Sequence, residues 1–487
     1  MRRFGLFLIF GLSLLFAAEI RDGTLYLEIN LAASPELVFE GTAFDLSEDD
    51  RLFQNSYSGK VRISVVSPES DNRYGLIERV ESTAGYVESE AVSHSYFAWE
   101  DEKLLIKHEH WFFLPDSFRD LAQAQAYASS LNYPYSRIQS IPIVNSTLLV
   151  IDASGESAYY ESPLKLSSQG QIWLNGLPYE GEFVLKIRNG KLVLNQLLPL
   201  EEYIAGVVPN EIGNNSPPEA LKAQAVAARS HAVSLLLYNR HTKDGYDLCS
   251  STHCQVYKGK HLRNAQIVDA VMQTAGEIMT VAGKVADATY HSSCGGKTDS
   301  SQAIWKGAYV PHLSGSTCIP EADEYDLSTQ RGASSWLNSK PDASGMSSWE
   351  QATMSWERTV SKAQVAKNIG LNSIRSIEIL ERGRSGRILK LRFIGDRTIV
   401  LDGEYKIRQA FGKLPSSFFV FKAAPGKTLF QPGSAITIKG RGSGHGVGMC
   451  QVGALRQART GLDYTQILQT YYPETEINTD WIDDERP

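Results

Sequence analysis

The sequence has no long block of basic residues, no repeat at a fixed period and, after its first residues, no apolar run that could cross a bilayer. Basic residues number 48 against 55 acidic ones, for a net charge of −7, and both signs are mixed along the chain. This distribution argues against a nucleic-acid-binding surface. With 42% hydrophobic residues over 487 positions, the composition is that of a globular protein long enough for more than one domain.

The first 18 residues have the pattern of a secretory signal. Two arginines precede an apolar run from Phe4 to Phe16, which is short for a membrane span. Residues 1–18 are therefore expected to be a signal peptide. The residues before Glu19 match the usual cleavage sequence poorly, so an uncleaved N-terminal anchor is the alternative. In both cases the protein is expected to be exported to the periplasm or cell envelope.

Cysteine is scarce, with five residues in the chain. Four fall between positions 249 and 318, enough for two disulfides in an oxidising compartment, for instance Cys249–Cys254 and Cys294–Cys318. Cys450 would be left over and is expected to be a buried thiol.

The same region could instead begin a zinc site, because Cys249, His253 and Cys254 lie close together in sequence. The spacing between the two cysteines is looser than in a usual zinc finger, and no second close pair follows. The sequence leaves zinc and disulfides open as alternatives.

Strand and helix patterns predict an α+β protein, with a mixed, β-rich core. Residues 19–152 read as a β-rich N-terminal accessory region, with a small strand–helix–strand unit near 108–152. Residues 153–475 begin with hairpins, including an Asn-Gly turn at 189–190, and continue as the main domain. An ordered excursion or long loop is expected near 320–355, and residues 476–487 form an acidic tail.

An alanine-rich helix is expected over residues 217–240, after a shorter one over 200–207. Ser216 and Glu219 have the spacing of a capping box at its start. Glu211 is expected in the loop between the two helices, beside apolar residues such as Val208. If those side chains exclude water, they raise the pKa of Glu211 and keep it protonated near neutral pH, as a general acid requires.

Several stretches closely resemble the SpoIID/LytB family, which contains stage II sporulation protein D and the amidase enhancers. The likeness begins with PLEEYIAGVVPNEI and PPEALKAQAVAARSHA. It continues in CSSTHCQVYKG (249–259), ATYHSSCGGKTDSSQAIW (288–305), SGRILKLRF (385–393) and GSGHGVGMCQVGALRQARTGLDYTQILQTYYPET (442–475). It covers roughly residues 160–475, and the N-terminal portion lies outside it.

The resemblance implies a lytic transglycosylase that cleaves the MurNAc–GlcNAc backbone of peptidoglycan, preferring strands without stem peptides. The family's catalytic acid corresponds to Glu211. No second acid accompanies Glu211 in the sequence, which suits this reaction better than ordinary hydrolysis with its two carboxylates. No cofactor is required, although some family members bind zinc near Cys249 and Cys254. The last glycine-rich stretch lacks the phosphate-loop form, so nucleotide binding is not expected.

A cleft beside the alanine-rich helix is expected to hold the glycan strand. Its candidate residues are Arg229, Gln255, Tyr257, His291, His445 and Gln451. His291 and His445 could equally be structural residues of glycine-rich turns.

Two other functions remain open at this stage. The first is a non-catalytic amidase enhancer or glycan-binding partner of a cell-wall amidase, a role also found in the family. The second is a zinc hydrolase using Cys249, His253 and Cys254, which lacks a conventional set of three catalytic ligands. The expected biological context is cell-wall remodelling in a process like sporulation or cell division.

Overall fold

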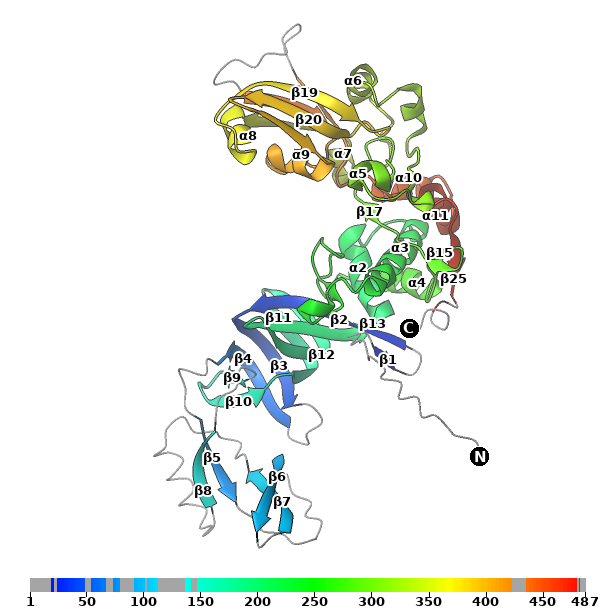
Figure 1. Cartoon of the computed structure of the whole chain (residues 1–487). Helices are drawn as coiled ribbons and strands as arrows, with labels where there is room; N and C mark the ends of the chain where they lie inside the picture. Colours follow the sequence, from blue (N-terminus) through cyan, green and yellow to red (C-terminus); the bar gives the residue numbers. More distant parts are fainter. Residues whose placement is uncertain are drawn as a thin grey trace, which may run out of the picture. The chain divides into compact units, whose positions relative to one another are not determined.

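The computed structural model describes residues 19–21, 24–48, 54–66, 73–78, 92–100, 103–112, 136–141, 147–260, 262–422, 435–479 and 481 (Figure 1). The expected signal over 1–18, the helix of the strand–helix–strand unit and most of the acidic tail lie outside these residues. In the described part of the chain, no helix is both long and apolar enough to span a membrane. The expected α+β class is confirmed.

The chain forms two compact units. The first contains the residues up to Leu200, together with 239–254 and 258–261, and the second contains Glu201–Tyr238, Gln255–Tyr257 and the residues from Leu262 onward. The division therefore falls at Leu200, whereas the sequence suggested a boundary near 152. Strands on both sides of residue 152 belong to one hydrogen-bonded sheet, and this pairing joins them into one unit.

The first unit is built on a ten-stranded sheet, with strand order β1-β2-β13-β12-β11-β3-β4-β9-β10 and β14 paired in parallel with β2. Its strands are β1 (Glu19–Arg21), β2 (Thr24–Ser34), β3 (Glu36–Glu48), β4 (Gln54–Val65), β9 (Thr147–Ile151), β10 (Ser157–Glu161), β11 (Leu164–Leu174), β12 (Leu177–Arg188), β13 (Lys191–Pro199) and β14 (Leu248–Cys249). A separate sheet has the order β6-β7-β5-β8, from β5 (Arg73–Glu78), β6 (Val92–Glu100), β7 (Lys103–Phe112) and β8 (Ser136–Ile141).

The alternation of buried and exposed side chains explains why one face of the large sheet packs into the core. Along β11 buried and exposed positions alternate, so one face of the strand packs into the core. The turn between β12 and β13 is the expected Asn-Gly turn, and Asn189 and Gly190 both have positive φ. This turn fixes the register that pairs Leu185 with Leu194.

A polar network in the first unit holds the segment that carries η1 (Thr242–Asp244) and β14. The Lys186 ammonium lies 2.6 Å from the Glu28 carboxylate, and the Asn195 side chain donates to the Gly245 carbonyl at 2.8 Å. The Glu28 N–H donates to the Asp247 carboxylate at 2.7 Å. These contacts tie residues 245–249 to β2 and β13.

The second unit combines helices with four small sheets. The helices are α2 (Leu200–Glu211), α3 (Pro218–Leu237), α4 (Ala265–Gln273), α5 (Ser301–Trp305), η2 (Pro311–Leu313), η3 (Pro320–Glu324), α6 (Gln330–Asn338), α7 (Ser348–Met354), α8 (Lys362–Asn368), α9 (Glu404–Ala410), α10 (Gln451–Arg459) and α11 (Tyr464–Tyr471). The sheets have orders β16-β15-β25, β17-β24, β18-β23-β22 and β19-β20-β21. Their strands are β15 (Ile278–Val281), β16 (Lys284–Val285), β17 (Tyr290–His291), β18 (Trp356–Ser361), β19 (Ile374–Arg382), β20 (Ile388–Gly395), β21 (Thr398–Asp402), β22 (Phe419–Phe421), β23 (Ala435–Gly440), β24 (Met449–Cys450) and β25 (Glu476–Asn478).

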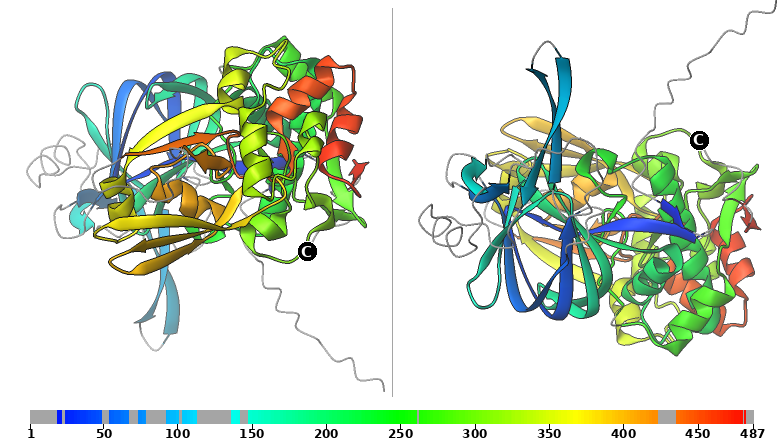
Figure 2. Two further views of the ribbon diagram at one scale, coloured as in Figure 1. Left: turned by 90° about the horizontal axis from the view of Figure 1, so that it is seen from above. Right: turned by 90° about the horizontal axis from the view of Figure 1, so that it is seen from below.

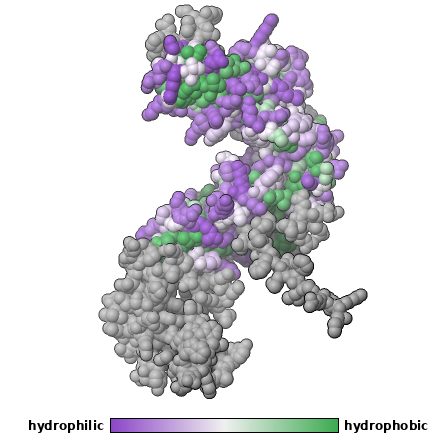
Figure 3. All heavy atoms as spheres, in the orientation of Figure 1, coloured by the Kyte–Doolittle hydropathy of each residue, from purple (hydrophilic) through white to green (hydrophobic). Residues whose placement is uncertain are grey.

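Helix α3 is central to the second unit, where it packs against α4, α10, α11 and β15. Figure 2 shows the orange and red C-terminal helices beside the green helices of this unit. The alanines of α3 explain its position, because small side chains allow other elements to approach closely. Ala223, Val226 and Ala227 are fully buried in one core cluster of this unit. Another cluster joins α8 and α9 to the strands β18–β23. At the surface, Figure 3 shows hydrophobic residues over the β19–β21 sheet, where Leu380 and Val400 are exposed.

The structure decides two local predictions: the capping box is wrong, and the excursion near 320–355 is the ordered one of its two alternatives. The capping box is absent, because no side chain caps the start of α3; instead the Ser216 hydroxyl donates to the Ile212 carbonyl at 2.7 Å. Glu219 accepts from the Lys222 ammonium and from the Tyr464 N–H. The excursion near 320–355 is not a long loop, since it folds into η3, α6 and α7, and its Trp336 is buried in the core.

An ion pair between the buried Glu350 and the partly exposed Arg459 fastens α7 to α10. Both oxygens of Glu350, which is 1% exposed, accept from the Arg459 guanidinium at 2.7 and 2.9 Å. Glu350 also accepts from the Ser347 N–H in a capping box. Burial alone would raise the pKa of Glu350, but the hydrogen bonds from Arg459 and Ser347 outweigh it and lower this pKa.

We expect Glu350→Gln to lower the free energy of unfolding by about 2 kcal/mol, because it leaves Arg459 without its anion. The control is Glu357→Gln, which disrupts an exposed pair with Lys422 and should cost about 0.5 kcal/mol or less. Urea denaturation measures both. A lowered folded-state pKa stabilises above the unfolded-state pKa, so the difference between wild type and Glu350→Gln should shrink as the pH falls through the folded-state pKa. Equal costs for the two variants would contradict the assignment.

Candidate active site

Glu211 is the last residue of α2, not a loop residue as the sequence suggested. Pro209 lies inside this helix and is the kind of residue that usually ends one. At the end of the helix, the Asn210 side chain donates to the Gly206 carbonyl and the Ile212 N–H donates to the Val208 carbonyl. The carboxyl group therefore lies at the negative end of a helix dipole, which disfavours its ionised form.

Two donors from distant parts of the sequence hold the Glu211 carboxyl. Its Oε1 accepts from the Val256 N–H at 2.9 Å, and its Oε2 accepts from the Gln451 amide at 3.4 Å. The same Gln451 nitrogen lies 3.2 Å from the Gln224 amide oxygen on α3. Gln224 and Gln451 are both buried, so these contacts fix the carboxyl from one side.

The net electrostatic effect on Glu211 is a raised pKa. Burial is the largest cause, and the hydrogen bonds from Val256 and Gln451 and the charge of His231 only partly offset it. The apolar neighbours expected from the sequence are present, since Val207, Val208 and Ile212 are all buried. The arrangement favours the protonated form of a carboxyl that still has partial access to solvent.

Gln255 and Tyr257 flank the Val256 amide that binds Glu211. The Gln255 amide donates to the Ala228 carbonyl at 3.2 Å and accepts from the Tyr290 hydroxyl at 2.7 Å. The Tyr257 ring packs against Tyr203, with centroids 5.4 Å apart. Both side chains are buried, so they hold the backbone segment 255–257 in place.

Arg229 is fully buried on α3 and binds another carboxylate. Its guanidinium donates to both oxygens of Glu201, at 2.8 and 2.6 Å, and to the carbonyls of Glu277 and Val271. Every hydrogen bond described for the Arg229 guanidinium goes to the Glu201 carboxylate or to a backbone carbonyl, and none goes to Glu211.

His291 on β17 and His445 in the glycine-rich loop lie side by side, with ring centroids 5.3 Å apart. The His445 Nδ1 accepts from the Val447 N–H, so its Nε2–H donates to the Tyr290 carbonyl at 3.0 Å. The His291 Nδ1 lies 3.1 Å from the Val447 carbonyl, and burial lowers the pKa of His291 to about 4. Both rings bind the backbone that shapes the loop, and no described hydrogen bond joins either ring to Glu211.

The loop needs glycine for steric reasons. Gly444, Gly446 and Gly448 have positive φ, and a Cβ at Gly448 would lie 1.9 Å from the Thr289 carbonyl oxygen. This close approach accompanies the parallel pairing of β17 with β24, which places Gln451 at the start of α10.

Two residues near the site were missed from the sequence. Tyr290 binds Gln255, and His231 on α3 forms a 2.7 Å contact with the Asp287 carboxylate. The His231 charge acts on Glu211, and its ring packs edge-on against Tyr290. Tyr290 lay in a motif that the sequence singled out, whereas nothing in the alanine-rich helix distinguishes His231.

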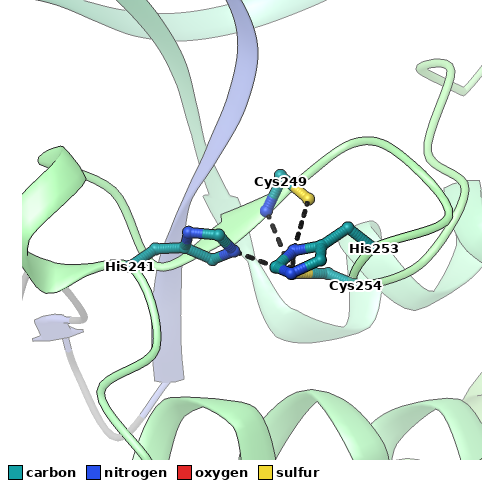
Figure 4. A group of neighbouring side chains, drawn as sticks. All are labelled: His241, Cys249, His253 and Cys254. Atoms are coloured by element: carbon teal, nitrogen blue, oxygen red, sulfur yellow. Dashed lines mark hydrogen bonds between the residues drawn. The ribbon is translucent and has the colours of Figure 1, made fainter. Parts of the chain in front are cut away.

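All five cysteines are free, and they form two groups. Cys249 and Cys254 lie with His241 and His253, all in the first unit (Figure 4). The expectation that Cys450 is buried is confirmed, but it is not left over, because it lies with Cys294 and Cys318.

The first group has the donors of a metal centre. One sulfur or nitrogen atom from each of its four residues lies within 4.8 Å of the others. The His241 Nε2 faces the Cys254 sulfur at 3.3 Å, while its Nδ1 lies 2.9 Å from the Asp244 carboxylate. A carboxylate behind a histidine is typical of metal sites, since it orients the ring. Hydrogen bonding from Cys254 is the main cause that lowers the pKa of Cys249 to about 3, so one thiolate is available.

Parts of the chain match known family models. The family model described as stage II sporulation protein matches residues 188–281, which include Glu211, Arg229 and residues 255–257. A second model, a domain of unknown function (DUF8618), matches residues 299–448.

Curated relatives extend the likeness. An uncharacterized protein of Brachyspira hyodysenteriae is 30% identical over 71% of this chain and 86% of its own length. The amidase enhancer of Bacillus subtilis is 29% identical over 75% of this chain, which spans only 52% of that relative. Stage II sporulation protein D of Bacillus subtilis is 29% identical over 58% of this chain and 75% of its own. The chain belongs to the SpoIID/LytB family.

The donor role of Gln451 can be tested directly. We expect Gln451→Leu to raise the pKa of Glu211 further, because the lost hydrogen bond favours the ionised carboxylate. NMR titration of glutamate side-chain carboxyl carbons, with Glu211 assigned by its loss in Glu211→Gln, measures this pKa. Gln351→Leu, at an exposed glutamine of α7, is the control and should leave it unchanged. An unchanged or lower pKa in Gln451→Leu would contradict the geometry.

Proposed function

We propose that this protein is an exported peptidoglycan lytic transglycosylase with Glu211 as its catalytic acid and base. The observation that carries the proposal is the desolvated Glu211 carboxyl, which has a raised pKa and is held by the Val256 N–H and the Gln451 amide. A carboxyl that retains its proton near neutral pH can protonate the oxygen of a glycosidic bond.

The reaction needs one such group. Glu211 donates its proton to the leaving oxygen of the MurNAc–GlcNAc bond and becomes a carboxylate. It then accepts the proton of the muramic 6-hydroxyl, whose oxygen attacks the anomeric carbon of the same sugar and forms a 1,6-anhydro end. Because the nucleophile belongs to the substrate, no second carboxylate has to activate water. This agrees with the described residues, where no other carboxylate hydrogen-bonds Glu211.

The Val256 N–H and the Gln451 amide suit both halves of this cycle. As donors they stabilise the carboxylate that follows the first proton transfer, while burial and the helix end favour the acid. Opposing influences of this kind bring a carboxyl pKa closer to the pH at which it must both give and take a proton.

The relatives' names support an extracytoplasmic role and a partner. One curated relative is named amidase enhancer, and another is a sporulation protein. We infer that the protein acts on glycan strands in the cell envelope, beside a cell-wall amidase that removes stem peptides. The alternative is that it only binds glycan and enhances such an amidase, with the same fold and without cleavage.

We expect Glu211→Gln to lower the rate of strand cleavage by about 10² to 10⁴-fold, because the amide cannot transfer the proton. The assay incubates peptide-free glycan strands with the purified protein and weighs the products by mass spectrometry. Anhydro ends lack the water molecule that hydrolysis would add. Glu202→Gln is the control, since Glu202 lies on the same helix and pairs with Arg263; it should keep normal activity.

The outcomes separate the two functions. If the wild type binds strands without cutting them, the enhancer role holds and catalysis is excluded. If the wild type cuts and Glu211→Gln cuts equally fast, another group is the acid.

We further propose that His241, Cys249, His253 and Cys254 hold a zinc ion. Two sulfurs and two imidazole nitrogens are the donor set of structural zinc, which closes its coordination with four protein ligands. Such a metal would supply folding energy to the segment 239–254. This assignment disfavours the zinc hydrolase, because a four-ligand site leaves no position for water.

Metal analysis of the purified protein tests this site. We expect Cys249→Ser to lose one zinc ion per chain relative to wild type and to lower the melting temperature. Ser250→Ala, next to it in sequence, is the control and should keep the zinc. Equal zinc content in wild type and Cys249→Ser would remove the proposal.

A further inference from the structure

A second group of cysteines lies in the second unit and takes no part in the proposed reaction or in the first metal site. Cys294 follows β17, Cys318 precedes η3, and Cys450 is the N-cap of α10. Their sulfur atoms all lie within 4.8 Å of one another. The exposed fractions of these residues are 1%, 7% and 1%, so the three thiols face each other in the core.

Each sulfur has a hydrogen-bonding partner of its own. The Cys450 sulfur accepts from the N–H groups of Cys294 and Gly453, at 3.2 and 3.3 Å. The Cys294 sulfur accepts from the Gly296 N–H at 3.3 Å, and the Cys318 sulfur lies 3.2 Å from the Tyr471 hydroxyl. Backbone donors and a helix N-terminus stabilise thiolates, and hydrogen bonds to sulfur are a regular feature of metal–thiolate centres.

A buried cation lies beside the same group. Arg387 is fully buried, and its guanidinium donates to the carbonyls of Cys294, Ser293 and Gly444. Among the described residues, no carboxylate forms an ion pair or hydrogen bond with it. The carboxylates of Glu404 and Asp299 and the Cys294 sulfur act on its charge electrostatically, because a buried charge is stabilised by each opposite charge near it. Three thiolates around one divalent cation carry one net negative charge, which matches Arg387.

We propose that Cys294, Cys318 and Cys450 bind a single thiophilic divalent cation, of which zinc is the representative, with Arg387 compensating its charge. The three sulfurs exclude hard cations such as magnesium and calcium, which require oxygen ligands. Binding changes no oxidation state: the thiols that are still protonated release their protons, and three sulfur–metal bonds form.

This site is linked to the Glu211 contact through α10. Cys450 immediately precedes Gln451, and a Cβ at Gly453 would lie 2.2 Å from the Cys318 sulfur, so the first turn of the helix rests on the cluster. A cation bound there fixes the start of α10 and thereby the amide that reaches Glu211. The metal site itself does not depend on the proposed function.

The experiment counts zinc in the full-length protein. The chain is reduced, stripped of metal with a chelator, loaded with Zn²⁺ and freed of unbound ion before metal analysis. We expect Cys318→Ala to hold one zinc ion fewer than wild type. Cys249→Ser is the matched control, because it removes a sulfur of the other group, and the double variant should lose both contributions. A zinc content in Cys318→Ala equal to that of wild type would overturn the proposal.

Two further measurements apply if Cys318→Ala does not fold. In the Cys249→Ser background, Co²⁺ should give the intense near-ultraviolet charge-transfer absorption of cobalt–thiolate bonds; its absence would reject the site. Arg387→Met, which keeps the volume and removes the charge, should weaken zinc binding about tenfold or more, in line with other outer-shell partners. Unchanged affinity would reject the charge argument.

A disulfide is the competing state of these thiols. It would make the unfolded chain, alkylated without reduction, lighter by the two alkyl groups that no longer attach to sulfur. A disulfide between any two of Cys294, Cys318 and Cys450, in protein isolated from its native compartment, would overturn the proposal. Alkylation of all three thiols without prior reduction would support the metal site.

Discussion

The site depends on one constraint: a carboxyl group must stay out of water and still be able to exchange a proton. The end of α2 supplies both conditions for Glu211, because its apolar neighbours are buried and the dipole of the helix opposes ionisation. The two donors that oppose this tendency come from residues 256 and 451. The surrounding architecture brings these three parts of the chain together around α3.

The histidines and the buried arginine show how much of a family's signature serves the scaffold. His291 and His445 bind the carbonyls of Val447 and Tyr290, and Arg229 neutralises Glu201. Each of these side chains contacts a carbonyl or a carboxylate that would otherwise be buried without a partner. Leaving such a group unpaired would lower the free energy of unfolding. A polar residue inside a motif is thus weak evidence of contact with substrate until its hydrogen bonds are known.

The elements with strong local signals could be predicted from the sequence. The Asn189-Gly190 hairpin and the alternating strands follow from turn chemistry and periodicity. The end of α2 could not be predicted, because proline usually ends a helix, whereas here the helix continues past Pro209 to Glu211. The meeting of Cys450 with Cys294 and Cys318 depends on the β17–β24 pairing, to which short-range patterns are blind.

The path of the chain between α3 and residue 255 has a consequence for how the protein can be divided. After Tyr238 the polypeptide leaves the second unit, contributes residues 239–254 to the first, including β14 beside β2, and returns with the Val256 amide that Glu211 requires. Neither unit is a continuous stretch of sequence. A single cut anywhere between β2 and residue 239 would separate this detour from the strand it pairs with, so the first unit cannot be isolated as one continuous fragment that ends at Leu200.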